Sequence, residues 1–369
     1  MRRNVWKLML AGMLAVSLLG GCGSKKEEAQ SAEIRKGAEA AADTATKAQT
    51  EPEKTIKMKL SYNSPELTED TSLETKFAQT LKRYLEEKAP GRFEVEIYPG
   101  AQLGSFSEVF SGVSDGNIDT ALVNISTMIS NDAKLNVWQI PGAIKSNEEC
   151  NLLLASKEAA ATFDEVEQNM GITVVTSFTA GARHFTNNKR EVKVPADMNG
   201  IVFRVMENEL YVKMVEYMGA IATPMSSSEL YSALQNGVVD GQENPTAFII
   251  SDMTYEVQKY MVTDGHVYSI SPYVVNTEWY NSLPEDLRII FDEGVEEARN
   301  AAIAFVENQE TEGIEFLRNN GITVYEPTAE ELALWHEAVF NGSYDYITNL
   351  IGKDTVDSFM EKIDSVSSK

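Results

Sequence analysis

A single arginine interrupts an otherwise apolar run at residues 201–205, and its chemistry suits the binding of an anion. The five residues are Ile-Val-Phe-Arg-Val, a pattern typical of a strand that is buried on both faces. Arg204 stands near the carboxyl end of this strand, and open parallel sheets bind ligands beyond that edge. A planar guanidinium there can hold a carboxylate through two parallel hydrogen bonds. The alternative is an arginine that pairs with a core Asp or Glu for structural reasons.

Residues suited to catalysis or metal binding lack the spacing that those functions need. The histidines, His184, His266 and His336, occur without an H-E-x-x-H or C-x-x-C pattern, so we expect no metal site. The folded region also lacks the G-x-x-x-x-G-K-[ST] motif of phosphate binding. A carboxylate pair such as Glu108 and Asp119 is the alternative for acid and base chemistry. We therefore predict no catalytic residue and no cofactor.

The elements that must position Arg204 begin with a strand, a helix and a second strand. Apolar residues alternate over 56–60, recur at helical spacing over 73–85 and alternate again over 93–97. This order in a short stretch predicts a βαβ unit and a parallel sheet. The fold class that follows is α/β.

The sequence predicts a long helical stretch near the carboxyl end of the chain, at about residues 284–319. At 1.5 Å per residue it would measure roughly 50 Å, which is enough to lie against two lobes. Gly294 and Gly313 are the places where it is expected to bend.

An internal repeat predicts that the chain has two similar halves. Residues 105–119 align without gaps on residues 226–240, and six of the fifteen positions are identical. Each copy begins with a Ser-x-x-Glu capping box and carries a glycine where its helix should end. The repeat therefore predicts two α/β lobes with a cleft between them, while chance similarity of two amphipathic helices is the alternative. The residues concerned are Ser105, Glu108 and Gly116 in the first copy and Ser226, Glu229 and Gly237 in the second.

The segments around Arg204 resemble the DctP-type solute-binding proteins of tripartite ATP-independent periplasmic (TRAP) transporters. The most specific signature is Y-x-A-L-Q-x-G-V-V-D-G-Q-E-N-P, within residues 230–245. Residues 198–205, 218–224 and 98–104 are also similar to that family. The resemblance extends from about Ile56 through the long helix.

The resemblance implies roles for several residues. Arg204 matches the family arginine that pairs with the ligand carboxylate. Arg183 matches a second family arginine, and Asn244 matches the asparagine of the Q-E-N-P motif. Glu108 matches a position that can face polar groups of the ligand, and Phe203 is among the aromatic residues that could stack on it. The alternatives are an exposed loop charge for Arg183, a turn residue for Asn244 and a helix cap for Glu108.

The resemblance also implies a two-lobe, periplasmic-binding-protein-like (type II) fold with the long helix spanning both lobes. We expect lobe I to comprise residues 56–180 and about 269–308, and lobe II to comprise residues 181–268 and about 309–369. The implied function is capture of a small carboxylate, such as a C4-dicarboxylate, a uronate or a sialic acid, for delivery to TRAP membrane subunits. The alternatives are a binding protein for an ABC transporter or a sensor kinase, and an exported enzyme that acts on acidic sugars.

The amino terminus predicts export and lipid anchoring. Residues 1–21 have a basic start and an apolar stretch too short to span a membrane, and they end before Cys22 as in a bacterial lipobox. Residues 22–55 are polar and are expected to form a flexible tether. An acylated Cys22 would leave Cys150 without a disulfide partner. The net charge of −24 argues against a nucleic-acid partner, which requires a basic surface. We expect an extracytoplasmic protein attached to the cell membrane.

Overall fold

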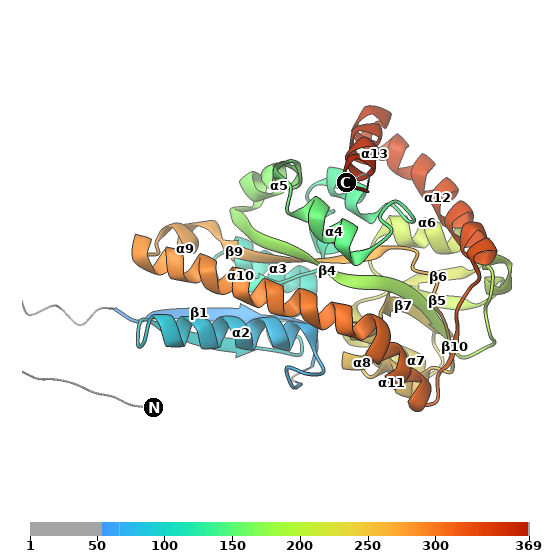
Figure 1. Cartoon of the computed structure of the whole chain (residues 1–369), viewed down its shortest axis with the longest axis horizontal. Helices are drawn as coiled ribbons and strands as arrows, with labels where there is room; N and C mark the ends of the chain where they lie inside the picture. Colours follow the sequence, from blue (N-terminus) through green and yellow to red (C-terminus); the bar gives the residue numbers. More distant parts are fainter. Residues whose placement is uncertain (1–53, 66, 368–369) are drawn as a thin grey trace, which may run out of the picture. The chain divides into compact units, whose positions relative to one another are not determined.

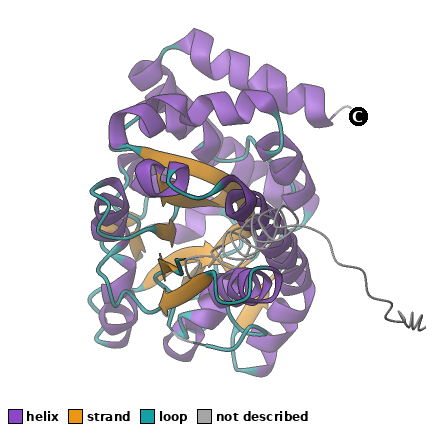
Figure 2. Ribbon diagram, turned by 90° about the vertical axis from the view of Figure 1, so that its left-hand side faces the viewer, coloured by secondary structure: helices purple, strands orange, loops and turns teal. Residues whose placement is uncertain are grey.

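The computed structural model describes residues 54–65 and 67–367. The predicted signal peptide, Cys22 and all but the last two residues of the tether lie outside them. The described residues from 55 onward form one compact unit, whose sheet has ten strands. Figures 1 and 2 show strands at the centre of this unit. The strands are β1 (Ile56–Ser61), β2 (Phe93–Tyr98), β3 (Thr120–Leu122), β4 (Ile172–Asn187), β5 (Val202–Val205), β6 (Ile221–Pro224), β7 (Gly241–Pro245), β8 (Tyr260–Val262), β9 (Tyr268–Asn276) and β10 (Thr323–Tyr325).

Strand β4 joins the two halves of the sheet because it changes partners along its length. The strand order is β2-β1-β3-β9-β4-β7-β5-β6, and β8 pairs with β4 and β10. The first part of β4, up to Ala182, pairs antiparallel with β9. Its last part, from Arg183 to Asn187, pairs antiparallel with β7. Parallel pairs lie on each side of it, β1 with β2 and β3, and β5 with β6 and β7.

Helices cover both sides of the strands (Figure 2). Among the described residues, none of these helices is long and apolar enough to cross a membrane. The helices are α2 (Leu73–Lys88), α3 (Phe106–Ser114), α4 (Asn147–Leu154), α5 (Lys157–Met170), α6 (Glu209–Tyr217), α7 (Ser227–Gln235), α8 (Thr246–Ser251), α9 (Thr277–Asn281), α10 (Glu285–Asn308), α11 (Ile314–Asn319), α12 (Ala329–Ile351) and α13 (Lys353–Ser367). Short 3₁₀ segments are η1 (Ile125–Thr127), η2 (Ala133–Gln139), η3 (Pro195–Met198) and η4 (Thr254–Val257).

The predicted βαβ unit and long helix are both present. Strands β1 and β2 pair in parallel with α2 between them in the chain. Helical structure is continuous from α10 through a π-helical turn, η5 (Gln309–Gly313), into α11. Figure 1 shows the helix changing direction between α10 and α11, so the bend expected at Gly313 is confirmed. Gly294 instead lies within α10, where a Cβ would come 2.9 Å from the ring of Tyr84 on α2. Its role is therefore close helix packing.

The strand that carries Arg204 is buried, as its apolar sequence predicts. β5 lies between β6 and β7 and pairs in parallel with both. Gly241, at the start of β7, is flanked by β4 and β5, and a Cβ there would collide with the carbonyl oxygen of Thr186 and the ring of Phe203. This close approach explains the glycine in the G-Q-E-N-P part of the signature.

Candidate functional site

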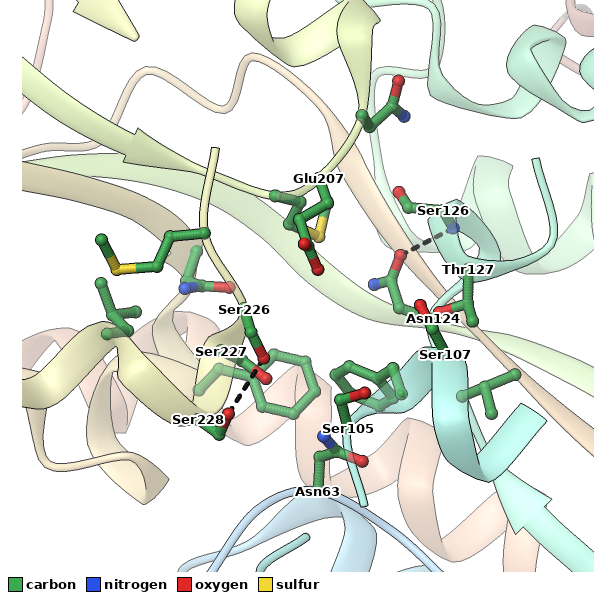
Figure 3. A pocket seen from close by; sticks show the side chains of 18 of the residues that line it. Asn63, Ser105, Ser107, Asn124, Ser126, Thr127, Glu207, Ser226, Ser227 and Ser228 are labelled. Atoms are coloured by element: carbon green, nitrogen blue, oxygen red, sulfur yellow. Dashed lines mark hydrogen bonds between the residues drawn. The ribbon is translucent and has the colours of Figure 1, made fainter. Parts of the chain in front are cut away.

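A cavity of about 750 Å³ opens at the carboxyl ends of the parallel strands, as the sequence predicts for a ligand site. Its walls follow β1, β2 and β3 in one half of the sheet and β5, β6 and β7 in the other. Figure 3 shows the hydroxyl-bearing side chains of the two walls facing one another. Its polar lining residues include Asn63, Glu74, Ser107, Thr127, Arg183, Arg204, Glu207, Ser226, Ser227, Ser228, Asn244 and Asp252.

Arg204 reaches this cavity as a buried cation that lacks an anionic partner. The residue is 2% exposed, and its Nε donates to the carbonyl oxygen of Met225 at 2.9 Å. Within residues 54–65 and 67–367, no carboxylate forms an ion pair with it. Burial lowers the pKa of Arg204 to about 10, although nearby carboxylates such as Glu243 oppose that shift. The group therefore still carries its charge at neutral pH, and an anion in the cavity would stabilise it.

The amino end of α7 lies beside Arg204 because Met225 directly precedes the N-cap residue, Ser226. The capping box predicted for Ser226 and Glu229 is wrong, since the Ser226 side chain makes no capping bond. The Ser226 hydroxyl instead bonds to the hydroxyl of Ser228 at 3.0 Å (Figure 3). The first turn of α7 thus keeps backbone N–H groups without a side-chain cap, and its dipole favours negative charge. Arg204 and this helix end thus place positive charge and backbone donors on the same side of the cavity.

Arg183 also lines the cavity, but its charge is already neutralised. The guanidinium forms a bidentate pair with Glu243, with Nε–Oε2 and Nη2–Oε1 distances of 2.5 and 2.9 Å. Nη2 also donates to the side-chain oxygen of Asn244 at 3.0 Å. The alternative of an exposed loop charge is therefore wrong, because Arg183 lies in β4 and is 1% exposed. The structural ion pair considered for Arg204 is found here instead.

The ion pair of Arg183 and Glu243 belongs to a larger buried group of charges. His266 contacts Glu243 through Nε2 at 3.2 Å and Asp264 through Nδ1 at 2.6 Å. Burial alone would lower the pKa of His266, but Asp264 and Glu243 raise it to about 9. Burial opposes ionisation of Glu243, yet Arg183 and His266 hold its pKa at about 2. Two cations face two carboxylates in this group, so the charge of Arg183 is balanced within it.

Four further carboxyl groups, those of Glu74, Glu207, Glu209 and Asp252, line the cavity. Burial shifts the pKa of two of them. Burial raises the pKa of Glu74 to about 7, although the backbone N–H of Ser64 donates to its Oε2 at 2.7 Å. Burial likewise raises the pKa of Asp252 to about 6. Glu207 is exposed and projects between the two walls (Figure 3). No local pattern predicts this grouping, because the residues come from three distant parts of the chain.

Glu74 should make stability depend on pH. Its pKa is higher in the fold than its ordinary value of 4.5, so its ionisation opposes folding. Its stabilising contribution is complete below about pH 4.5 and is lost as the pH rises through about 7. We expect Glu74→Gln to raise the free energy of unfolding by about 3 kcal/mol more at pH 8 than at pH 4. Urea denaturation at both pH values measures this, with exposed Glu337→Gln as the control. Equal effects of Glu74→Gln at both pH values would contradict the prediction.

The structure does not bring two of the expected contact residues into the cavity lining. The Glu108 carboxylate accepts hydrogen bonds from the backbone N–H and hydroxyl of Ser105 at 2.8 and 2.9 Å, so it completes the predicted capping box of α3. Phe203 is fully buried and packs against Phe185 with ring centroids 5.1 Å apart. Neither residue is among those that line the cavity.

Asn63 is a lining residue that the sequence did not single out. It follows β1, and its side chain points toward the cavity (Figure 3). Its amide nitrogen and oxygen are both buried and have no hydrogen-bond partner among the described residues. Leaving such groups unpaired costs about 1–3 kcal/mol each, so a bound polar molecule would stabilise this side chain. Among the described residues, no cluster of three or more His, Cys, Asp or Glu side chains could hold a metal ion.

Comparison with known proteins identifies the class of the chain. Residues 63–347 match the family model DctP, described as bacterial extracellular solute-binding protein, family 7. The chain belongs to this family, which confirms the predicted TRAP-type, DctP-family membership. It is accordingly an extracytoplasmic solute-binding protein and not an enzyme.

Individual relatives agree with this assignment. The C4-dicarboxylate-binding periplasmic protein DctP of Rhodobacter capsulatus is 26% identical over 285 residues, which cover 76% of this chain and 84% of that one. A TRAP periplasmic solute-binding protein from Bordetella bronchispeptica, whose ligand density is assigned to pantoate, is 29% identical with a TM-score of 0.75, covering 83% and 99% of the two chains. One from Polaromonas, bound to D-erythronate, is 26% identical with a TM-score of 0.75, covering 83% and 98%. The predicted type II fold is thereby confirmed.

Proposed function

We propose that the protein captures a small organic or sugar acid by its carboxylate and delivers it to the membrane subunits of a TRAP transporter. The observation that carries this proposal is Arg204, a buried cation beside the uncapped end of α7 with no anionic partner among the described residues. A ligand carboxylate would accept two charge-assisted hydrogen bonds from the guanidinium. Asn244 would border the ligand, and Arg183 would hold Asn244 in place through its 3.0 Å bond.

The ligands of the relatives support a carboxylate. Those relatives are described with a C4-dicarboxylate, with pantoate and with D-erythronate. Their ligands differ in length and in hydroxyl content, but each carries a carboxylate. The shared group is the one that Arg204 suits.

We further propose that two lobes close over the ligand. The boundary expected at residues 180 and 181 lies next to the point where β4 leaves β9 and joins β7. The cavity walls come from both sides of this point, since Asn63, Ser107 and Thr127 precede it and Arg204 and Ser227 follow it. A hinge in β4 and β9 would bring the two walls together around a bound acid.

A thermal-shift screen over organic and sugar acids tests the proposed function. An acid present at 100 times its dissociation constant should stabilise the protein by about 2.7 kcal/mol. The alcohol or amide that corresponds to each acid serves as the control and should give no shift. If no acid stabilises the protein more than its neutral counterpart does, the proposal is wrong.

We propose that Cys22 anchors the protein to the cell membrane through an N-terminal lipid. The support is the lipobox-like sequence of residues 19–22 after a short apolar stretch. Expression with a labelled fatty acid should mark the wild type and leave Cys22→Ala unlabelled. Label retained in Cys22→Ala would contradict the anchor.

A further inference from the structure

The balance of charge in the cavity restricts which acids fit it. The cavity lining contains two arginines, and Arg183 is neutralised by Glu243. Arg204 therefore supplies the only uncompensated positive charge among the described lining residues. Glu207 extends into the space between the walls (Figure 3), and Glu74 and Asp252 also border it. A second carboxylate on a ligand would meet these acidic groups without a cation to pair with.

The walls instead present groups that bind hydroxyls. Figure 3 shows Ser107 and Thr127 on one wall and Ser227 on the other. The side-chain hydroxyls of these three residues have no hydrogen-bond partner in the described part of the chain. Each can donate one hydrogen bond and accept others. These unpaired hydroxyls surround the space into which Glu207 projects.

Two further side chains extend this hydroxyl-binding surface. The Asn63 amide offers both a donor and an acceptor that are buried without a partner among the described residues. The Glu207 carboxylate can accept hydrogen bonds from two neighbouring ligand hydroxyls through its two oxygens. A volume of about 750 Å³ lies within the range of sites that enclose drug-sized molecules. The cavity therefore has room for a chain of several hydroxylated carbons beyond the carboxylate.

From these observations we infer that the ligand is a polyhydroxy monocarboxylate, such as an aldonate or a uronate, and that Glu207 sets this specificity. This inference rests on the proposed function, because Arg204 must hold the carboxylate. Glu207 accepts hydrogen bonds from ligand hydroxyls and repels a second carboxylate. Discrimination thus combines an attraction to the preferred ligand with a repulsion of the competing one.

Calorimetric titration with D-gluconate, D-glucuronate, hexanoate and succinate tests the inference. We expect a hydroxylated monocarboxylate to bind the wild type at least about tenfold more tightly than hexanoate or succinate. Glu207→Gln should weaken binding of that hydroxy acid about tenfold and strengthen binding of succinate. The preference for the hydroxy acid over succinate would then narrow or reverse. The matched control is Glu337→Gln, which removes one exposed carboxylate outside the cavity lining and should change neither affinity.

The outcomes separate this inference from the proposed function. Succinate binding that is as tight as that of the hydroxy acids and is lost in Arg204→Ala would overturn the inference and leave the proposed function intact. Equal effects of Glu207→Gln on both kinds of acid would also overturn it. If none of the four acids binds in an Arg204-dependent manner, the inference falls, and the broader thermal-shift screen then decides the proposed function by itself.

Discussion

Replacement of Arg204 with alanine is expected to weaken binding of the cognate acid by roughly 10² to 10³-fold, or about 3 to 5 kcal/mol. The loss should be large because the ligand carboxylate would be buried without its cation, in a cavity that Asp252 and Glu74 also line. Among the described residues, Arg204 is held by the carbonyl of Met225 and by no carboxylate, so its removal leaves no buried acid unpaired. We therefore expect the free energy of unfolding without ligand to change far less than the affinity. Isothermal titration calorimetry measures the first quantity and urea denaturation the second.

Two variants sharpen the Arg204 prediction. Arg204→Lys keeps the charge but loses the planar fork, so it should also bind weakly. Arg83→Ala removes the same charge from an exposed site that pairs with Glu69 and should leave affinity unchanged. Near wild-type affinity in Arg204→Ala would refute the carboxylate clamp.

Replacement of Arg183 should instead act on stability. Arg183→Met would leave the Glu243 carboxylate, which is fully buried, without its bidentate partner. Removal of one member of a buried pair costs about 3 to 5 kcal/mol. His266 would remain beside Glu243 at 3.2 Å, which compensates part of the lost charge. We therefore expect urea denaturation to show a loss of stability in the lower part of that range.

The double variant Arg183→Met/Glu243→Leu tests the cause of this loss. Both charges are then absent, so the variant should recover at least half of the stability that Arg183→Met loses. If the double variant is less stable than Arg183→Met, the buried carboxylate is not the source of the penalty. If Arg183→Met alone costs under about 1 kcal/mol, the ion pair is not the anchor of this region.

Local patterns in the sequence were sufficient to predict the main elements. The continuous apolar run at residues 201–205 predicted a strand buried on both faces, and Phe203, Arg204 and Val205 of β5 are all buried. Helical spacing predicted α2 and the helix that continues through α10 and α11. The repeat at residues 105–119 and 226–240 placed α3 and α7 as comparable helices, and the amino ends of both border the cavity. These features depend on residues close together in the chain, which is why periodicity reveals them.

The site was less predictable because its contacts join distant residues. The pairing of Arg183 with Glu243 spans 60 positions and arises from the register of β4 against β7. The capping box expected at Ser226 has the right residue types, but the Ser226 hydroxyl forms a hydrogen bond with the Ser228 hydroxyl instead. Burial of Glu74 and the unpaired amide of Asn63 depend on the packing of the folded chain around them. No spacing rule within one segment encodes these contacts.

A crystal structure of the protein with an acid from the thermal-shift screen would test the role of Arg204 most directly. We predict that both carboxylate oxygens lie about 2.7–2.9 Å from guanidinium nitrogens of Arg204. Arg183 should still be paired with Glu243 in that complex, as it is without ligand. A ligand carboxylate bound to Arg183 or to backbone groups alone, with Arg204 making no contact to it, would contradict the role proposed for Arg204.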